Sequence, residues 1–232
     1  MSDIGLFEAM YSARALRRLK PDPVPEEILT RILDAAIRAP SAGNAQNWAF
    51  VVVRDAEMRR QLGLVYRKAS EIAAAMYAAR ERPTHMTEAQ YRQMLSAGAH
   101  LWDHMGDAPV LLVPCARDRP LPRREALPPE LQAGYAHEVA YGDRIRGASI
   151  YPAVQNIILA CRAFGLGVVL TTNHIRCESE VKALLGLPDD VSTYALMPIG
   201  YPQDKFGPVR RRPLCEVAYA DRWGSAWQGL VS

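Results

Sequence analysis

A helix, a polar loop and a short strand follow one another between residues 25 and 53, and this order constrains the fold more than any other feature. Pro25 and the two glutamates after it predict a helix start, because proline suits the first helical position and acids face the positive end of the helix dipole. Apolar residues then recur on one helical face until the pattern stops before Pro40: Ile28, Leu29, Ile32, Leu33, Ala36 and Ile37. Residues 50–53, Phe-Val-Val-Val, are too few and too β-branched for a helix and predict a buried strand.

The rest of the chain also alternates between helical and extended patterns. Spacing and composition predict helices at 4–15, at 151–164, at 179–185 and over most of 56–104. The block 56–104 is interrupted near 82–84. Gly165 and Gly186 are expected to end the helices at 151–164 and 179–185. Apolar runs predict strands at 110–113, ended by Pro114, at 167–171 and at 194–200. Repeated prolines and mixed charge predict a surface loop at 117–129. The long helical block before the second strand favours an α+β fold over a doubly wound one.

Composition excludes several classes of protein. The chain has 232 residues, 49% of them hydrophobic, and no shift of composition divides it, so we expect a single domain over residues 1–232. A net charge of +3 does not favour a nucleic-acid surface. The four cysteines form no Cys-x-x-Cys pair and predict reduced thiols. We see no basic leader followed by an apolar core and no apolar run near the about 18 residues of a membrane span, and we therefore expect a cytoplasmic protein that does not bind membranes.

Three familiar site patterns are incomplete. Gly165 and Gly167 lack the third glycine of a dinucleotide-binding turn, and they end a helix instead of starting one. His174 and Cys177 have a ligand-like spacing but no second pair, so we expect no metal site. Ser149 lacks the second glycine of a nucleophile elbow and is more typical of a helix N-terminus.

Two groups of polar residues suit a flat, phosphorylated ligand. In the loop before the first predicted strand, Ser41, Asn44 and Gln46 carry hydroxyl and amide groups that both donate and accept hydrogen bonds, although the same residue types form turns in any protein. Arg14 and Arg17, three residues apart near the end of the first predicted helix, would share one face. A guanidinium group meets two phosphate oxygens at once and keeps its charge.

Together with Gly165-Leu166-Gly167 and Arg210-Arg211-Arg212, these residues closely resemble the nitroreductase family, whose members are dimeric FMN-dependent oxidoreductases. The resemblance covers nearly the whole chain, and its specific parts lie at residues 13–18, 40–48, 147–171 and 198–213. It implies a three-layer α+β fold in which helices flank a central mixed, mainly antiparallel sheet. It also implies an intertwined homodimer with FMN at the subunit interface.

The resemblance further implies which residues bind FMN. It assigns the phosphate to two basic clusters and the isoalloxazine ring to the segment 165–172, whereas alternation along exposed chain predicts that Arg18 and Arg211 point to solvent. The implied set is Arg14, Ala15, Arg17, Pro40, Ser41, Asn44, Gln46, Leu170, Thr171, Arg210 and Arg212, with the phosphate held by Arg14, Arg17, Arg210 and Arg212.

The chain departs from the family pattern at three positions. The family usually has arginine where this chain has Ala13, often serine where it has Ala15, and usually proline where it has Asn47. The first two departures predict fewer or backbone-mediated phosphate contacts. The third predicts a less restricted backbone beside the substrate.

The resemblance implies a ping-pong reaction. NADH or NADPH passes hydride to FMN and leaves, and a small oxidant such as a nitroaromatic or quinone takes its place. Because the cofactor supplies the chemistry, we name no catalytic residue. We expect residues 66–104 and 117–146 to shape the substrate pocket, with Tyr135 or Tyr141 in its wall. The alternatives are related flavin chemistry, namely reductive dehalogenation or oxygen-dependent flavin fragmentation, a non-enzymatic flavin-binding protein, and a degenerate homologue without flavin.

Overall fold

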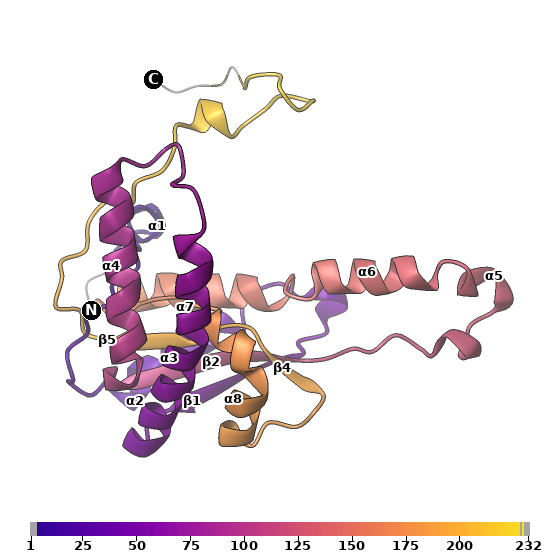
Figure 1. Cartoon of the computed structure of the whole chain (residues 1–232), viewed down its shortest axis with the longest axis horizontal. Coiled ribbons are helices and arrows are strands. Elements are labelled where there is room, and N and C mark those ends of the chain that lie inside the picture. Colours follow the sequence, from indigo (N-terminus) through magenta and orange to yellow (C-terminus); the bar gives the residue numbers. More distant parts are fainter. Residues whose placement is uncertain (1–3, 228, 230–232) are drawn as a thin grey trace.

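The computed structural model describes residues 4–227 and residue 229. Its centre is one antiparallel sheet in the order β1 (Trp48–Val53), β2 (Val110–Arg117), β5 (Met197–Gly200) and β3 (Gly167–Val168), shown in Figure 1. A further strand, β4 (Val191–Thr193), pairs with the end of β2. Each pairing between the described strands is antiparallel.

The central strand β2 divides the hydrophobic core into two parts. Because successive side chains of a strand point to opposite faces, Val110 and Leu112 enter one core cluster and Leu111 and Val113 the other. Strands of this kind, buried on both faces, read as continuous apolar runs, which is why the sequence predicted β2 correctly at its start.

Helices cover both faces of the sheet and complete three layers. On one face, α2 (Glu26–Ala36) and α7 (Ile150–Ala163) bury residues such as Ile32 and Ile157. On the other, α3 (Ala56–Ala78), α4 (Glu88–His104) and α8 (Glu178–Leu185) contribute Leu62, Leu101 and Val181. The expected three-layer α+β fold is confirmed, as is the helical block 56–104 with its break.

Local capping explains where several of these helices begin and end. Asp55 accepts a hydrogen bond from the Met58 amide at the start of α3, and Thr87 forms a capping box with Gln90 at the start of α4. Helix α8 ends at Gly186, whose left-handed φ of 63° fits the predicted glycine cap.

Strand β2 continues through Pro114 to Arg117, so the prediction that proline ends it is wrong. The Pro114 carbonyl accepts a hydrogen bond from the Tyr194 amide at 2.9 Å. On the same side of the strand Pro114 has no N–H to return to the Tyr194 carbonyl, which instead accepts a bond from the Tyr151 hydroxyl at 3.4 Å. The side chain of Tyr151 thus supplies the hydrogen bond that Pro114 cannot donate.

Other boundaries also differ from the sequence predictions. Helix α1 (Leu6–Ser12) stops before Arg14, so Arg14 and Arg17 lie in non-helical chain and do not share a helix face. The predicted strand at 167–171 shortens to β3 plus one bridge between Thr171 and Leu196, and the strand predicted from residue 194 starts at Met197. The short 3-10 helices are η1 (Ala42–Asn44), η2 (Met105–Asp107), η3 (Arg124–Ala126), η4 (Asn173–Cys177) and η5 (Leu214–Glu216).

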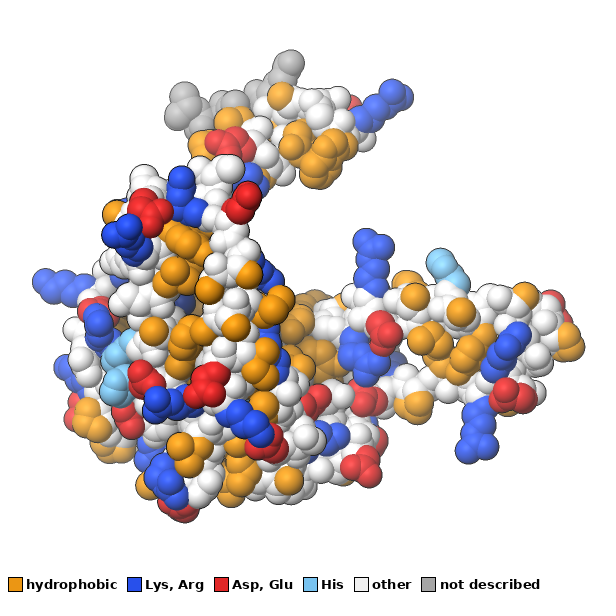
Figure 2. Space-filling view, in the orientation of Figure 1, with side chains coloured by type: hydrophobic (Ala, Val, Ile, Leu, Met, Phe, Trp, Pro, Cys, Tyr) orange, Lys and Arg blue, Asp and Glu red, His pale blue; other side chains and the backbone are white. Residues whose placement is uncertain are grey.

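Two segments extend away from the three-layer body. The first is an arm that contains α5 (Pro129–Gln132) and α6 (Tyr135–Ile145), to which the expected loop 117–129 leads. The second is the C-terminal segment 214–227, which rises above the body in Figure 1. Figure 2 shows hydrophobic side chains exposed on both. Within the described chain, no helix is long and apolar enough to cross a membrane.

Candidate functional site

The residues that the sequence singled out lie at two opposite ends of the sheet. At one end Trp48 pairs with Ala116, so the loop 40–47 lies beside the carboxyl end of β2. At the other end Leu19 forms a bridge with Pro202, just beyond β5, so the segment 14–19 lies there. The eight residues of β2 separate the two groups by about 26 Å at about 3.3 Å per residue.

The loop 40–47 has a strained and internally bonded backbone. Gly43, Asn44 and Gln46 have left-handed φ angles of 59°, 52° and 47°, a region that costs a non-glycine residue about 1–3 kcal/mol. Ser41 Oγ accepts a hydrogen bond from the Gln46 amide at 3.0 Å, and the Gln46 side-chain amide donates to Asn44 Oδ1 at 3.2 Å. Strain of this kind persists where the surroundings fix it, which is typical of a binding loop.

Contacts with distant residues hold this loop in place. The Ala42 amide donates to Ser149 Oγ at 3.1 Å, and Asn47 Nδ2 donates to the Arg117 carbonyl at 2.8 Å. Ser149 precedes α7, as predicted, and Asn47 makes a side-chain bond that a proline there would lack. Pro40, Asn44 and Gln46 are exposed, so their polar groups are accessible on the surface of this chain.

At the other end of the sheet, Arg14 lies beside the C-terminal chain. A Cβ added to Gly207 would meet Arg14 Nη1 at 3.7 Å, and the Val209 amide donates to the Tyr11 carbonyl at 2.8 Å. The fold therefore brings the Arg14 segment next to the chain that leads into Arg210. Arg212 lies farther along and approaches Glu216 at 3.9 Å.

Arg17 is less exposed than Arg14 and lines a cavity. Its side chain is partly buried, which lowers the pKa of its guanidinium, but arginine remains charged in proteins. The electrostatic interaction with the hydroxyl of Tyr66 acts in the other direction and raises the pKa of Arg17. The buried Tyr66 in turn lies 2.9 Å from Thr171 Oγ1, so Arg17 and Thr171 belong to one neighbourhood.

Helix α3 also contributes to this neighbourhood, although no sequence pattern predicted it. Ser70, one helical turn after Tyr66, accepts a hydrogen bond from Asn173 Nδ2 at 3.4 Å, and both α3 residues are buried. Their only sequence signal is the position on the buried face of α3, next to Leu62 and Ala73. Leu170, by contrast, is exposed, and Ala15 offers the Arg17 guanidinium only its carbonyl, at 3.5 Å.

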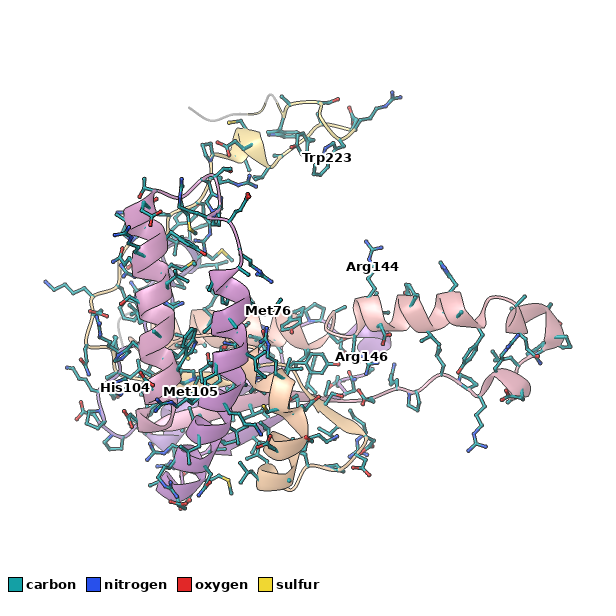
Figure 3. The ribbon with its side chains drawn as sticks, viewed as in Figure 1. Met76, His104, Met105, Arg144, Arg146 and Trp223 are labelled. Carbon is teal, nitrogen blue, oxygen red and sulfur yellow. The ribbon has the colours of Figure 1, made fainter. Side chains whose placement is uncertain are left out.

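Two hollows flank the segment 14–19. A cavity of about 190 Å³ lies against Arg17 and is also lined by His100, His104 and Gln203. The two imidazole rings stack at 4.3 Å near the lower end of α4, where Figure 3 labels His104. Partial burial, followed by the nearby His104 and Arg18, lowers the pKa of His100. The second hollow, of about 540 Å³, lies beside α1 and is lined by Glu8, Tyr11, Ser12, Arg162, Phe206, Gly207 and Pro208.

The described residues offer no cluster of three metal-binding side chains. Burial raises the pKa of Cys115 to about 12 and also raises that of Cys161, so neither is a thiolate at neutral pH. The arrangement therefore suits binding and orientation of a ligand through guanidinium, hydroxyl and amide groups.

His174 is fully buried with no hydrogen bond to either ring nitrogen, and burial lowers its pKa to about 4. The unfolded chain binds a proton below an ordinary pKa of about 6.5, so native stability is complete above that pH and decreases as the pH falls toward 4. We expect a loss of about 2 kcal/mol in unfolding free energy between pH 7.5 and pH 5. Denaturant unfolding at both pH values measures it.

The matched variants for this pH dependence are His174→Leu and the exposed His85→Leu. His174→Leu should remove about 2 kcal/mol of the pH dependence, because leucine does not titrate. His85→Leu should leave it unchanged. Equal pH dependence in the wild type and His174→Leu would contradict the assignment to His174.

Comparison with known proteins agrees with this geometry. The model of the Nitroreductase family matches residues 11–201. A protein named NADH dehydrogenase from Thermus thermophilus is 34% identical over 213 residues, which are 90% of this chain and 92% of that protein. Two solved structures share the fold. A BluB-like flavoprotein from Clostridium difficile is 20% identical with a TM-score of 0.70, over 94% of this chain and 100% of that one. Iodotyrosine deiodinase bound to FMN and 3-iodo-L-tyrosine is 24% identical with a TM-score of 0.65, over 94% of this chain and 99% of that one. The chain belongs to the Nitroreductase family.

Proposed function

We propose that the protein is an FMN-dependent oxidoreductase that takes hydride from NADH or NADPH and reduces a small oxidant such as a nitroaromatic or quinone. The observation that carries the proposal is that Arg14, Arg17 and the chain leading to Arg210 lie at the same end of the sheet, with Arg14 beside Gly207. Family membership and a relative named NADH dehydrogenase support it. The proposal treats residues 1–232 as one cytoplasmic domain, of which residues 1–3, 228 and 230–232 lie outside the described chain.

The donor set fits FMN. Arg14 and Arg210 have no carboxylate partner among the described residues, so their charge is available for a phosphate. Thr171 and Arg17 supply donors for the polar edge of the ring system. When bound, the isoalloxazine supplies the hydride chemistry, and positive charge beside it favours its anionic reduced form. The chain's own part is to hold the ring, exclude water and stabilise that charge.

A second copy of the chain is part of the proposal. Ser41, Asn44 and Gln46 lie at the far end of the sheet from Arg17, too distant to bind the same ligand within one chain. We propose that they reach the FMN held by a partner chain. Phe7 on α1 is 67% exposed, and Trp223 in the C-terminal segment, labelled in Figure 3, is 90% exposed. Large apolar side chains that are exposed in one chain support a homodimer that would cover them.

The first test is an absorbance spectrum of the purified protein before and after anaerobic addition of NADH or NADPH. We expect a yellow protein whose released chromophore is FMN and whose absorbance bleaches on reduction. The control is the same protein without a nicotinamide. A yellow protein that bleaches with dithionite but not with either nicotinamide would contradict the proposed electron donor. A colourless protein that takes up no added FMN would overturn the site.

Reductive dehalogenation is the second candidate, because the solved relative with bound 3-iodo-L-tyrosine has the same fold. The two candidates differ in the oxidative half-reaction. Reduced protein mixed with a nitroaromatic, a quinone and an iodinated phenol in separate anaerobic vessels distinguishes them through the product. Iodide release faster than nitro or quinone reduction would favour the second candidate.

A further inference from the structure

Tyr66 places a phenol in the middle of an otherwise small and apolar helix face. It is 2% exposed and shares the buried face of α3 with Leu62, Ala69 and Ala73. A tyrosine in such a place usually finds a partner for its hydroxyl. Here the partner is Thr171 Oγ1, at 2.9 Å and 105 residues away in sequence.

The contact belongs to a hydrogen-bonded network that joins α3 to the turn 171–173. The Asn173 amide donates to Thr171 Oγ1 at 3.5 Å, and Asn173 Nδ2 donates to Ser70 Oγ at 3.4 Å. Tyr66 and Ser70 on one side and Thr171 and Asn173 on the other therefore hold helix α3 against the turn 171–173. Arg17 interacts electrostatically with the Tyr66 hydroxyl.

Either hydroxyl of the Tyr66–Thr171 pair can donate, and one of the two arrangements leaves the Thr171 proton free for another acceptor. A hydroxyl has one proton and two acceptor lone pairs. Burial raises the pKa of Tyr66, so the phenol keeps its proton at neutral pH. If the phenol and the Asn173 amide donate into Thr171 Oγ1, both lone pairs are used. The Thr171 proton then points away from α3, and Thr171 itself is only half-buried.

We propose that Tyr66 is a positioning residue that holds the Thr171 hydroxyl as a hydrogen-bond donor toward the flavin. The inference rests on the proposed function, because the flavin is the group that receives the bond. It makes α3 part of the flavin site without contact between Tyr66 and the flavin. One neutral hydrogen bond contributes about 0.5–1.5 kcal/mol, which corresponds to about a two- to tenfold change in affinity.

The test compares Tyr66→Phe with Tyr77→Phe, a tyrosine on the same helix that is 39% exposed and outside the network. Three quantities are measured: the FMN dissociation constant, the flavin midpoint potential against a reference dye, and the visible spectrum. The melting temperature of each apoprotein checks that it is folded. We expect about two- to tenfold weaker binding and a shifted potential and spectrum for Tyr66→Phe, with no change for Tyr77→Phe.

Thr171→Val separates an indirect from a direct role. If Tyr66 acts through Thr171, adding Tyr66→Phe to Thr171→Val should change neither affinity nor potential further. Unchanged affinity, potential and spectrum in Tyr66→Phe would overturn the inference while leaving the FMN site intact. If Tyr66→Phe changed the affinity and potential equally in the wild type and in Thr171→Val, the inference would also be overturned. A wild-type protein that binds no FMN would instead overturn the proposed function beneath it.

Discussion

Replacing Arg14 with alanine is expected to weaken FMN binding about ten- to a hundredfold. A charge-assisted hydrogen bond contributes about 1.5–3 kcal/mol, and Arg14 has no carboxylate among the described residues that would compete for its charge. Alanine also stands at positions 13 and 15, where the family usually has arginine and often serine, so fewer side chains remain to compensate. Fluorescence titration of apoprotein with FMN measures the effect.

Arg211→Ala is the matched control, because Arg211 belongs to the other basic cluster and its guanidinium donates to the neighbouring Arg210 carbonyl at 2.8 Å. We expect its FMN affinity to match the wild type. Because raised salt screens exposed charges, the difference between wild type and Arg14→Ala should shrink as ionic strength rises. An Arg14→Ala protein that keeps its full flavin after dilution would contradict the phosphate role.

The elements that the sequence predicted well are those specified by local pattern. The apolar face of α2 buries Leu29, Ile32 and Ala36 as its periodicity predicted, although Ile37 is exposed. The run Phe50 to Val53 forms a strand as predicted, but only Val53 is fully buried. Helix α6 was not predicted; its apolar side chains, Val139, Tyr141 and Ile145, are spaced two and four apart and all lie exposed. Pro114 was misjudged because the group that replaces its missing bond, the Tyr151 hydroxyl, is distant in sequence.

The candidate site was predictable in its residue types but not in its arrangement. The arginines and the loop 40–47 carry recognisable chemistry, whereas their separation follows from strand register that no local pattern encodes. Tyr66 gave no signal because a buried tyrosine on a helix is ordinary core until its partner is known. Arg14 and Arg17 were placed on one helix face, but α1 ends at Ser12 and they point to different neighbours.

The separation of the two groups predicts that damaged chains can rescue each other. One variant carries Arg17→Ala; the other carries Asn44→Gly and Gln46→Gly, which remove two side chains while glycine accepts their left-handed backbone. Each homodimer should bind FMN poorly, because every site lacks one group. A mixed dimer combines an intact Arg17 from one chain with an intact loop from the other, so one of its two sites is restored.

Random assortment of equal amounts makes half of the dimers mixed, so about one quarter of all sites should regain wild-type affinity. FMN titration of the refolded or co-expressed mixture should show these restored sites as a separate tight-binding phase. The control is the sum of the titrations of the two variants measured separately. If each site were built within one chain, every site would carry a defect and no tight phase would form. Restoration therefore distinguishes a site shared between chains from one contained in a single chain, which is what the opposite ends of the sheet require.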